Sequence, residues 1–234
     1  IFMAKFVPPL NEVAFPAYSR IKDDPAAMRR GFLKTVRLLM LVSAPFYCGL
    51  TVVAAPLVET LFGPKWLGMA PYVQHISLAL MLMTVQILFA PVNNALGKPS
   101  VTMFVSLGGA IIFPTAFLIG SQWGLIGMAW AWLVAAPLLL LYTVRLSARL
   151  IGLSLWDIVR AMLPGLAPAL MMAIGVELAA ELIVPFHWAA PIRLGLLVGL
   201  GVALYGALLW TFERDVIAEG IQIVLRREPA ADPA

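Results

Sequence analysis

Six polar side chains lie within long apolar stretches of this sequence, and each needs a partner or a function there. They are Lys5, Asn11, Glu12, His75, Gln86 and Asn93. Polar and ionisable groups are costly inside hydrocarbon, and in membrane proteins they commonly mark the path of a substrate or an ion. These six residues are therefore our candidates for substrate binding.

The first group combines a basic, an amide and an acidic side chain. Lys5 and Glu12 are seven residues apart and would share one face of a regular helix. Pro8 and Pro9 lie between them and are expected to break that helix. Broken helices recur in transporter binding sites, which favours a cavity here. The alternative is that Lys5 extends to the membrane surface and binds nothing.

The second group lies on one predicted helix. From His75 to Gln86 the offset is 11 residues, and from Gln86 to Asn93 it is seven. At about 100° per residue, these offsets place all three side chains on one face. Two interpretations remain open: the face lines a wet cavity, or its side chains form hydrogen bonds to neighbouring helices.

Other chemistry is poorly represented. The sequence has no P-loop, nucleophile elbow, paired-aspartate motif or His/Cys metal spacing, and His75 and His187 are far apart. Glu177 and Glu181 could relay protons, although Glu181 is close to a predicted outer loop. We therefore expect no cofactor, no metal and no enzymatic activity. The net charge of +4 does not indicate nucleic-acid binding, because the basic residues flank the apolar stretches.

The elements that position these side chains follow from composition. Hydrophobic residues make up 62% of the chain and charged residues 12%, against about 25% charged in soluble domains. About 20 apolar residues span the hydrocarbon core as a helix, and the charge-free blocks 38–58, 66–97 and 99–144 reach or exceed that length. Alternating segments typical of a membrane β-barrel are absent. The sequence predicts an all-α, polytopic transmembrane helix bundle.

About seven spans are predicted, followed by a tail. The spans cover about 1–19, 32–58, 70–95, 99–120, 123–146, 160–184 and 191–212, and the tail covers 213–234. Asp24 before Pro25 and the Ser154-x-x-Asp157 capping box predict two helix starts. Gly195 and Gly199, spaced four apart, predict close helix packing on the last span.

The basic residues predict an orientation. In this topology 13 of the 16 lysines and arginines fall on one side of the membrane. They are Arg20, Lys22, Arg29, Arg30, Lys34, Arg37, Lys98, Arg145, Arg149, Arg160, Arg214, Arg226 and Arg227. Lys65 and Arg193 fall on the opposite side. The positive-inside rule therefore predicts a cytoplasmic C-terminal tail.

Five short segments follow one another in a recognisable order. They are Asn11–Asp24, Pro45–Gly49, Leu61–Trp66, Asn94–Lys98 and Gly124–Gly127. In order and spacing the set resembles the oligosaccharide and polysaccharide flippases, the polysaccharide branch of the multidrug/oligosaccharidyl-lipid/polysaccharide exporter superfamily. The resemblance covers about residues 5–165. Such proteins have about 14 spans, so the resemblance implies that this chain is the C-terminal lobe.

The resemblance also implies a function. Such flippases move lipid-pyrophosphate-linked oligosaccharides, of the undecaprenyl-pyrophosphate type, across the bacterial cytoplasmic membrane by alternating access between two lobes. Lys5 would suit the pyrophosphate, and the other five candidates would suit sugar hydroxyls or coupling ions. The implied partners are this lipid-linked substrate, membrane lipids, the N-terminal lobe, and the polysaccharide polymerase and chain-length machinery. Surface polysaccharide synthesis, as of O-antigen or exopolysaccharide, is the implied process.

Two alternatives remain. A multidrug/cation antiporter of the same superfamily would be favoured by an aspartate inside a span, and none of the predicted spans has one. A membrane-bound glycosyl- or acyltransferase would need catalytic loops, and the predicted external loops are short.

Overall fold

The computed structural model describes residue 16, residues 18–183 and residues 188–212. Within these residues the regular structure is entirely helical, which confirms the predicted all-α class. The longer helices are α2 (Pro25–Val52), α4 (Ala70–Gln86), α6 (Pro99–Gly120), α7 (Gly124–Ser147), α8 (Leu155–Ile183) and α9 (Ala190–Phe212). They are connected by two short helices, α3 (Ala54–Phe62) and α5 (Phe89–Ala95), and by three short 3₁₀ segments, η1 (Pro64–Met69), η2 (Ser121–Trp123) and η3 (Ala148–Ile151).

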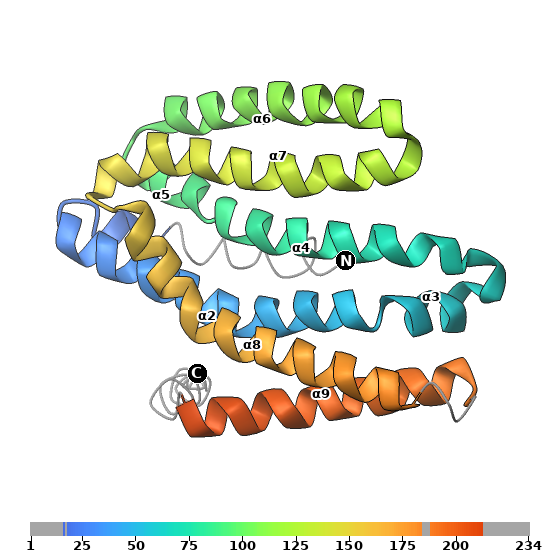
Figure 1. Cartoon of the computed structure of the whole chain (residues 1–234). Coiled ribbons are helices and arrows are strands. Elements are labelled where there is room, and N and C mark those ends of the chain that lie inside the picture. Colours follow the sequence, from blue (N-terminus) through green and yellow to red (C-terminus); the bar gives the residue numbers. More distant parts are fainter. Residues whose placement is uncertain (1–15, 17, 184–187, 213–234) are drawn as a thin grey trace, which may run out of the picture.

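The long helices pack side by side in the spatial order α6, α7, α4, α2, α8, α9 (Figure 1). Helix α2 is central, because it contacts both α4 and α8. Its buried side chains recur every three or four residues, which is the spacing of one helix face. They include Met28, Phe32, Val36, Met40 and Ala44, each with no exposed surface.

Five stretches of the described residues are long and apolar enough to cross a membrane. They are Pro25–Val52, Pro64–Ala95, Pro99–Ile151, Leu155–Leu182 and Ala190–Thr211. The stretch Pro99–Ile151 contains two antiparallel helices, α6 and α7, joined at Gly120–Gly124 (Figure 1). The prediction was about seven spans, and the first of these, about 1–19, lies almost wholly outside the described residues. The chain is a multi-pass membrane protein.

Two predicted spans are interrupted at prolines. Helix α2 ends at Val52 and α3 restarts at Ala54, whereas α4 ends at Gln86 and α5 restarts at Phe89. Each interruption lies three or four residues before a proline, Pro56 or Pro91. A proline has no N–H for the carbonyl four residues earlier, and its ring crowds that carbonyl. The break places each proline in the first turn of the next helix, where it is tolerated.

Pro45 has a different outcome, since α2 continues through it to Val52. The carbonyl that Pro45 leaves without an intrahelical donor belongs to Leu41. The Tyr205 hydroxyl of α9 donates a hydrogen bond to that carbonyl oxygen at 2.7 Å. A side chain from another helix therefore replaces the missing backbone donor.

Close packing of helices occurs at a glycine that the sequence pattern did not single out. A Cβ on Gly165 of α8 would lie 2.5 Å from the Met40 carbonyl carbon of α2, so the two backbones nearly touch. Gly195 and Gly199 of α9 have no heavy atom within 4 Å of a Cβ built on them. The expected packing through these two glycines is therefore not found in the described part of the chain.

Candidate functional site

The described candidates lie where α4 and α5 pack against α7. Asn93 is 1% exposed, whereas His75 and Gln86 are half-buried. Lys5, Asn11 and Glu12 lie outside the described residues. The structure thus brings three of the six candidates to one helix contact, and their role in substrate binding remains a prediction.

Two hydrogen bonds join this face to α7. The Gln86 side-chain amide donates to Thr143 Oγ1 at 3.3 Å, and Thr143 donates onward to the Leu139 carbonyl at 2.8 Å. The Asn93 side-chain amide donates to Ser147 Oγ at 2.9 Å. Thr143 and Ser147 are fully buried and one turn apart on α7. These contacts support the interpretation of the stripe as hydrogen bonds between helices.

His75 is held by its own helix and by an aromatic ring. Its Nδ1 lies 2.5 Å from the Pro71 carbonyl oxygen, one turn earlier on α4. Its ring packs edge-on against Trp130 of α7, with 4.8 Å between the ring centroids. All three polar residues therefore contact α7, at positions 130, 143 and 147.

One buried acceptor remains at this contact. The Oδ1 atom of Asn93 accepts no hydrogen bond within the described structure, although its amide nitrogen is bonded to Ser147. Leaving a buried acceptor without a donor is costly, so this atom can accept a hydrogen bond from a hydroxyl or from water. Thr143 and Ser147 were missed at the sequence level, although their spacing of four residues on an apolar helix was available as a signal.

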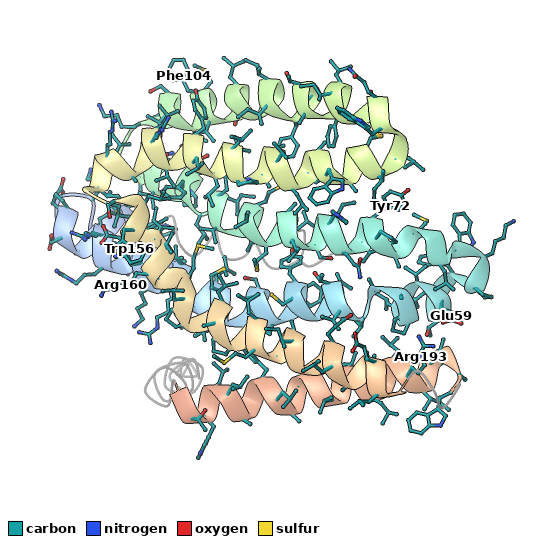
Figure 2. All side chains as sticks on the ribbon, in the orientation of Figure 1. Glu59, Tyr72, Phe104, Trp156, Arg160 and Arg193 are labelled. Atoms are coloured by element: carbon teal, nitrogen blue, oxygen red, sulfur yellow. The ribbon has the colours of Figure 1, made fainter. Side chains whose placement is uncertain are left out.

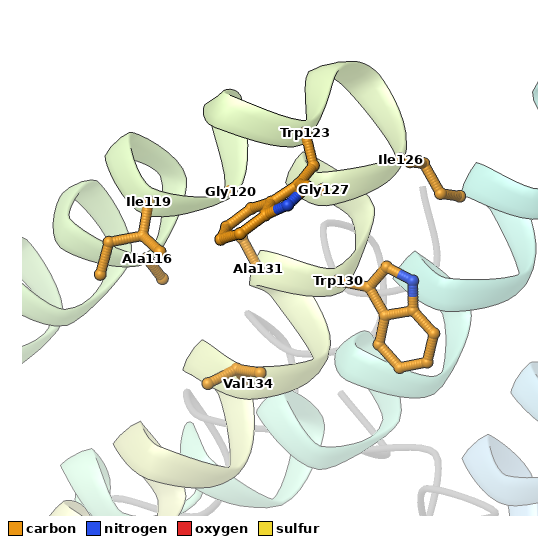
Figure 3. A pocket seen from close by; sticks show the side chains of 9 residues that line it. All are labelled: Ala116, Ile119, Gly120, Trp123, Ile126, Gly127, Trp130, Ala131 and Val134. Atoms are coloured by element: carbon orange, nitrogen blue, oxygen red, sulfur yellow. The ribbon is translucent and has the colours of Figure 1, made fainter.

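The tip of the α6–α7 hairpin contains an apolar pocket of about 430 Å³. Trp123 and Trp130 line it together with Ala116, Ile119, Ile126 and Val134 (Figure 3). The pocket offers almost no polar surface, so it lacks the groups that would pair with a charged headgroup. No cluster of metal-ligating side chains occurs among the described residues. Glu177 and Glu181 are exposed on α8.

Comparison with known proteins identifies similar sequences. A family model described as a polysaccharide biosynthesis protein matches residues 1–71. This range includes Lys5, Asn11 and Glu12. No solved structure gives a significant match to the chain.

Several curated proteins are similar over most of this chain. The teichuronic acid biosynthesis protein TuaB of Bacillus subtilis is 28% identical over 86% of this chain and 42% of its own length. The lipopolysaccharide biosynthesis protein WzxC of Escherichia coli is 28% identical over 76% of this chain and 38% of its own. The succinoglycan biosynthesis transport protein ExoT of Rhizobium meliloti is 25% identical over 95% of this chain and 45% of its own length.

The matched relatives are longer than this chain, which spans less than half of their length. Their names repeat the process that the five ordered segments implied. The bundle of apolar helices agrees with a membrane role. The resemblance stated from the sequence is therefore confirmed: the chain is a multi-pass membrane protein similar to proteins named for polysaccharide biosynthesis and transport.

Proposed function

We propose that this chain is a lobe of a flippase that moves lipid-pyrophosphate-linked oligosaccharides across the bacterial cytoplasmic membrane. The observation that carries the proposal is the similarity to WzxC and ExoT over most of the chain, in a bundle of apolar helices. The substrate class is a glycan on an undecaprenyl-type pyrophosphate carrier. The activity is transport rather than catalysis.

In the proposed mechanism, two lobes alternate access to a polar cavity between them. A pyrophosphate brings about two negative charges into a low-dielectric space, where an unpaired charge is costly. The ammonium of Lys5 offsets that cost, and Asn11 and Glu12 contact sugar hydroxyls or coupling ions. Gln86 and Asn93 hold α4 and α5 against α7 by hydrogen bonds, so this part of the lobe moves as one body.

The proposal is tested by export in a strain lacking its own flippase. The complete transporter carrying Lys5→Glu should export little surface polysaccharide per unit of membrane-inserted protein, because the glutamate would repel the negatively charged pyrophosphate. Lys5→Arg should retain more activity because it keeps the charge. Lys22→Glu is the matched control, since Lys22 is exposed before α2. Full export by the Lys5→Glu variant would show that Lys5 does not bind the pyrophosphate.

The same assay tests the lobe assignment. Residues 1–234 alone should insert but should not restore export, because the polar groups of the cavity would lack their partners in the other lobe. Export by residues 1–234 alone would show that no second lobe is required.

The proposed orientation places the ends of α2 and α8 that carry Arg29, Arg30 and Arg160 in the cytoplasm. In a Cys48→Ala background, Gln122→Cys should react with an impermeant thiol reagent in intact cells. Arg149→Cys should react only after the membrane is opened. Labelling of position 149 in intact cells would show that the topology is the reverse of the one proposed.

The antiporter alternative gains no support from the described residues. Their aspartates are Asp23, Asp24 and Asp157, which lie before α2 or in the first turn of α8. None of these lies in the apolar part of a helix.

A further inference from the structure

A basic pocket lies between α2 and α8, away from the contact of α4 and α5 with α7. Its volume is about 440 Å³. Four of its lining residues are basic: Arg30, Lys34, Arg37 and Arg160. The first three are spaced at i, i+4 and i+7, so they share one face of α2, and Arg160 approaches from α8.

The described lining of this pocket has more basic than acidic residues. Against the four basic residues, Asp157 is the one acidic residue of that described lining. It forms an ion pair with Arg29 Nη2 at 2.9 Å and accepts hydrogen bonds from the backbone N–H and hydroxyl of Ser154. The lining therefore favours an anionic ligand.

The position of the pocket favours a lipid over a soluble anion. Arg37 and Arg160 are the last charged residues before the charge-free stretches 38–58 of the α2–α3 region and 161–176 of α8. Leu33 and Ala161 also line the pocket. A ligand here meets basic groups at one side and apolar helix surface at the other, which matches a phosphate joined to acyl chains.

The entrance to α8 adds an interfacial side chain. Trp156 is 64% exposed, one turn before Arg160. Figure 2 places Trp156 and Arg160 at the end of the bundle opposite Glu59 and Arg193. Tryptophan is enriched at the level of lipid headgroups, so this end of α8 is placed at the membrane surface.

We propose that the pocket between α2 and α8 binds the phosphate headgroup of an anionic membrane lipid. Arginine and lysine donate charge-assisted hydrogen bonds to phosphate oxygens, and the acyl chains lie along the apolar surfaces of the two helices. Such a lipid would bridge α2 and α8 at the end where the Arg29–Asp157 ion pair also joins them. The inference depends on insertion in a membrane and not on the transported glycan.

The test measures phosphatidylglycerol binding to the purified complete transporter in neutral-lipid nanodiscs, by native mass spectrometry. The variant Arg30→Gln/Lys34→Gln/Arg160→Gln removes three exposed charges from the pocket. The control Lys22→Gln/Arg145→Gln/Arg149→Gln removes three exposed charges at the same end of the bundle. Each basic charge near an anionic surface is worth about fivefold in binding, so the pocket variant should lose at least about tenfold in affinity relative to the control.

Equal losses in the two variants would show a general surface attraction and would overturn the proposal. Competition by glycerol phosphate at concentrations near those of the lipid would show that a soluble phosphate suffices, which would overturn the lipid assignment. Competition only by phosphatidylglycerol would support it.

A second measurement needs no variant. A photoreactive phosphatidylglycerol analogue bound to the unmodified transporter should crosslink to peptides containing residues 30–37 and 155–161. Crosslinks confined to other helices would overturn the site. This measurement does not depend on glycan export, so a negative result would contradict the lipid site without contradicting the flippase proposal.

Discussion

Two helix contacts in this bundle are made in opposite ways. The contact of α4 and α5 with α7 uses polar side chains, with Gln86 bonded to Thr143 and Asn93 to Ser147. At the contact of α2 with α8, a Cβ on Gly165 would lie 2.5 Å from the Met40 carbonyl carbon. Lipid tails are as apolar as the surfaces of these helices, so burying apolar side chains between helices gives little driving force. Hydrogen bonds or close backbone packing must therefore hold the helices together.

The difference predicts how each contact responds to change. Where two backbones pack closely there is no room for a larger side chain. A hydrogen-bonded pair can lose one of its polar groups without a steric clash. Substitutions at the glycine contact should therefore cost more than substitutions that remove a hydrogen-bonding group.

The largest effect is expected for Gly165→Val. Its side chain would collide with the α2 backbone at Met40 and Leu41, which cannot move aside as a side chain could. Overpacking of a close contact costs about 1–3 kcal/mol, and collision with backbone belongs at the upper end. The measurement is the unfolding free energy of the purified protein in detergent. Gly199→Val is the control, because its site is open within the described structure; equal losses at the two sites would contradict the assignment of the close contact.

A smaller effect is expected at the polar contact, for Asn93 and Ser147. A double-mutant cycle with Asn93→Ala and Ser147→Ala isolates their mutual contribution from the cost of each truncation. Such pairs in membranes contribute about 0.6 kcal/mol and at most about 1.7 kcal/mol. Asn94→Ala, which loses a hydrogen bond from Thr102 of α6 instead, is the control and should show no coupling to Ser147→Ala. Strict additivity of the two losses would show that the pair contributes nothing.

An effect of similar size is expected for Tyr205→Phe, which removes the donor to the Leu41 carbonyl. The loss should be about 0.5–1.5 kcal/mol, the net value of a typical hydrogen bond. Pro45→Ala restores a backbone N–H to α2, so Leu41 regains an intrahelical donor. Tyr205→Phe should then cost less in the Pro45→Ala background than in the unmodified protein. An undiminished cost would show that the hydroxyl does not replace the missing donor.

Much of the fold could be predicted from local signals. Asp24 accepts hydrogen bonds from the N–H groups of Ala26 and Ala27 at the start of α2, as its position before Pro25 indicates. Ser154 and Asp157 form the predicted capping box at the start of α8. Both motifs act within one helical turn, so the sequence contains all their partners.

The outcome at each proline could not be predicted in the same way. Pro45, Pro56 and Pro91 all remove a backbone donor, yet only the helix at Pro45 continues. The difference at Pro45 is accompanied by Tyr205, which is 164 residues from its acceptor Leu41. Gly165 likewise has meaning only beside Met40. Sequence periodicity contains no information about which distant helix will be adjacent.

The candidate site was predictable in its geometry but not in its partners. The offsets of 11 and 7 residues placed His75, Gln86 and Asn93 on one face, and all three contact α7. The partners Thr143 and Ser147 support contacts between helices, and their spacing of four residues on an apolar helix was the one signal for them in the sequence. The basic residues of α2 predicted only the orientation in the membrane, although the spacing of Arg30, Lys34 and Arg37 also places them on one helix face.

The bond between Tyr205 and Leu41 has a consequence for biosynthesis. A ribosome makes α2 long before α9, so the Leu41 carbonyl enters the membrane without the hydroxyl that later bonds to it. An unsatisfied carbonyl in lipid is costly, and α2 is therefore weakest near Pro45 until α9 packs against it. Docking of α9 then supplies a donor to a residue made 164 positions earlier, so the consolidation of α2 depends on a later step of synthesis.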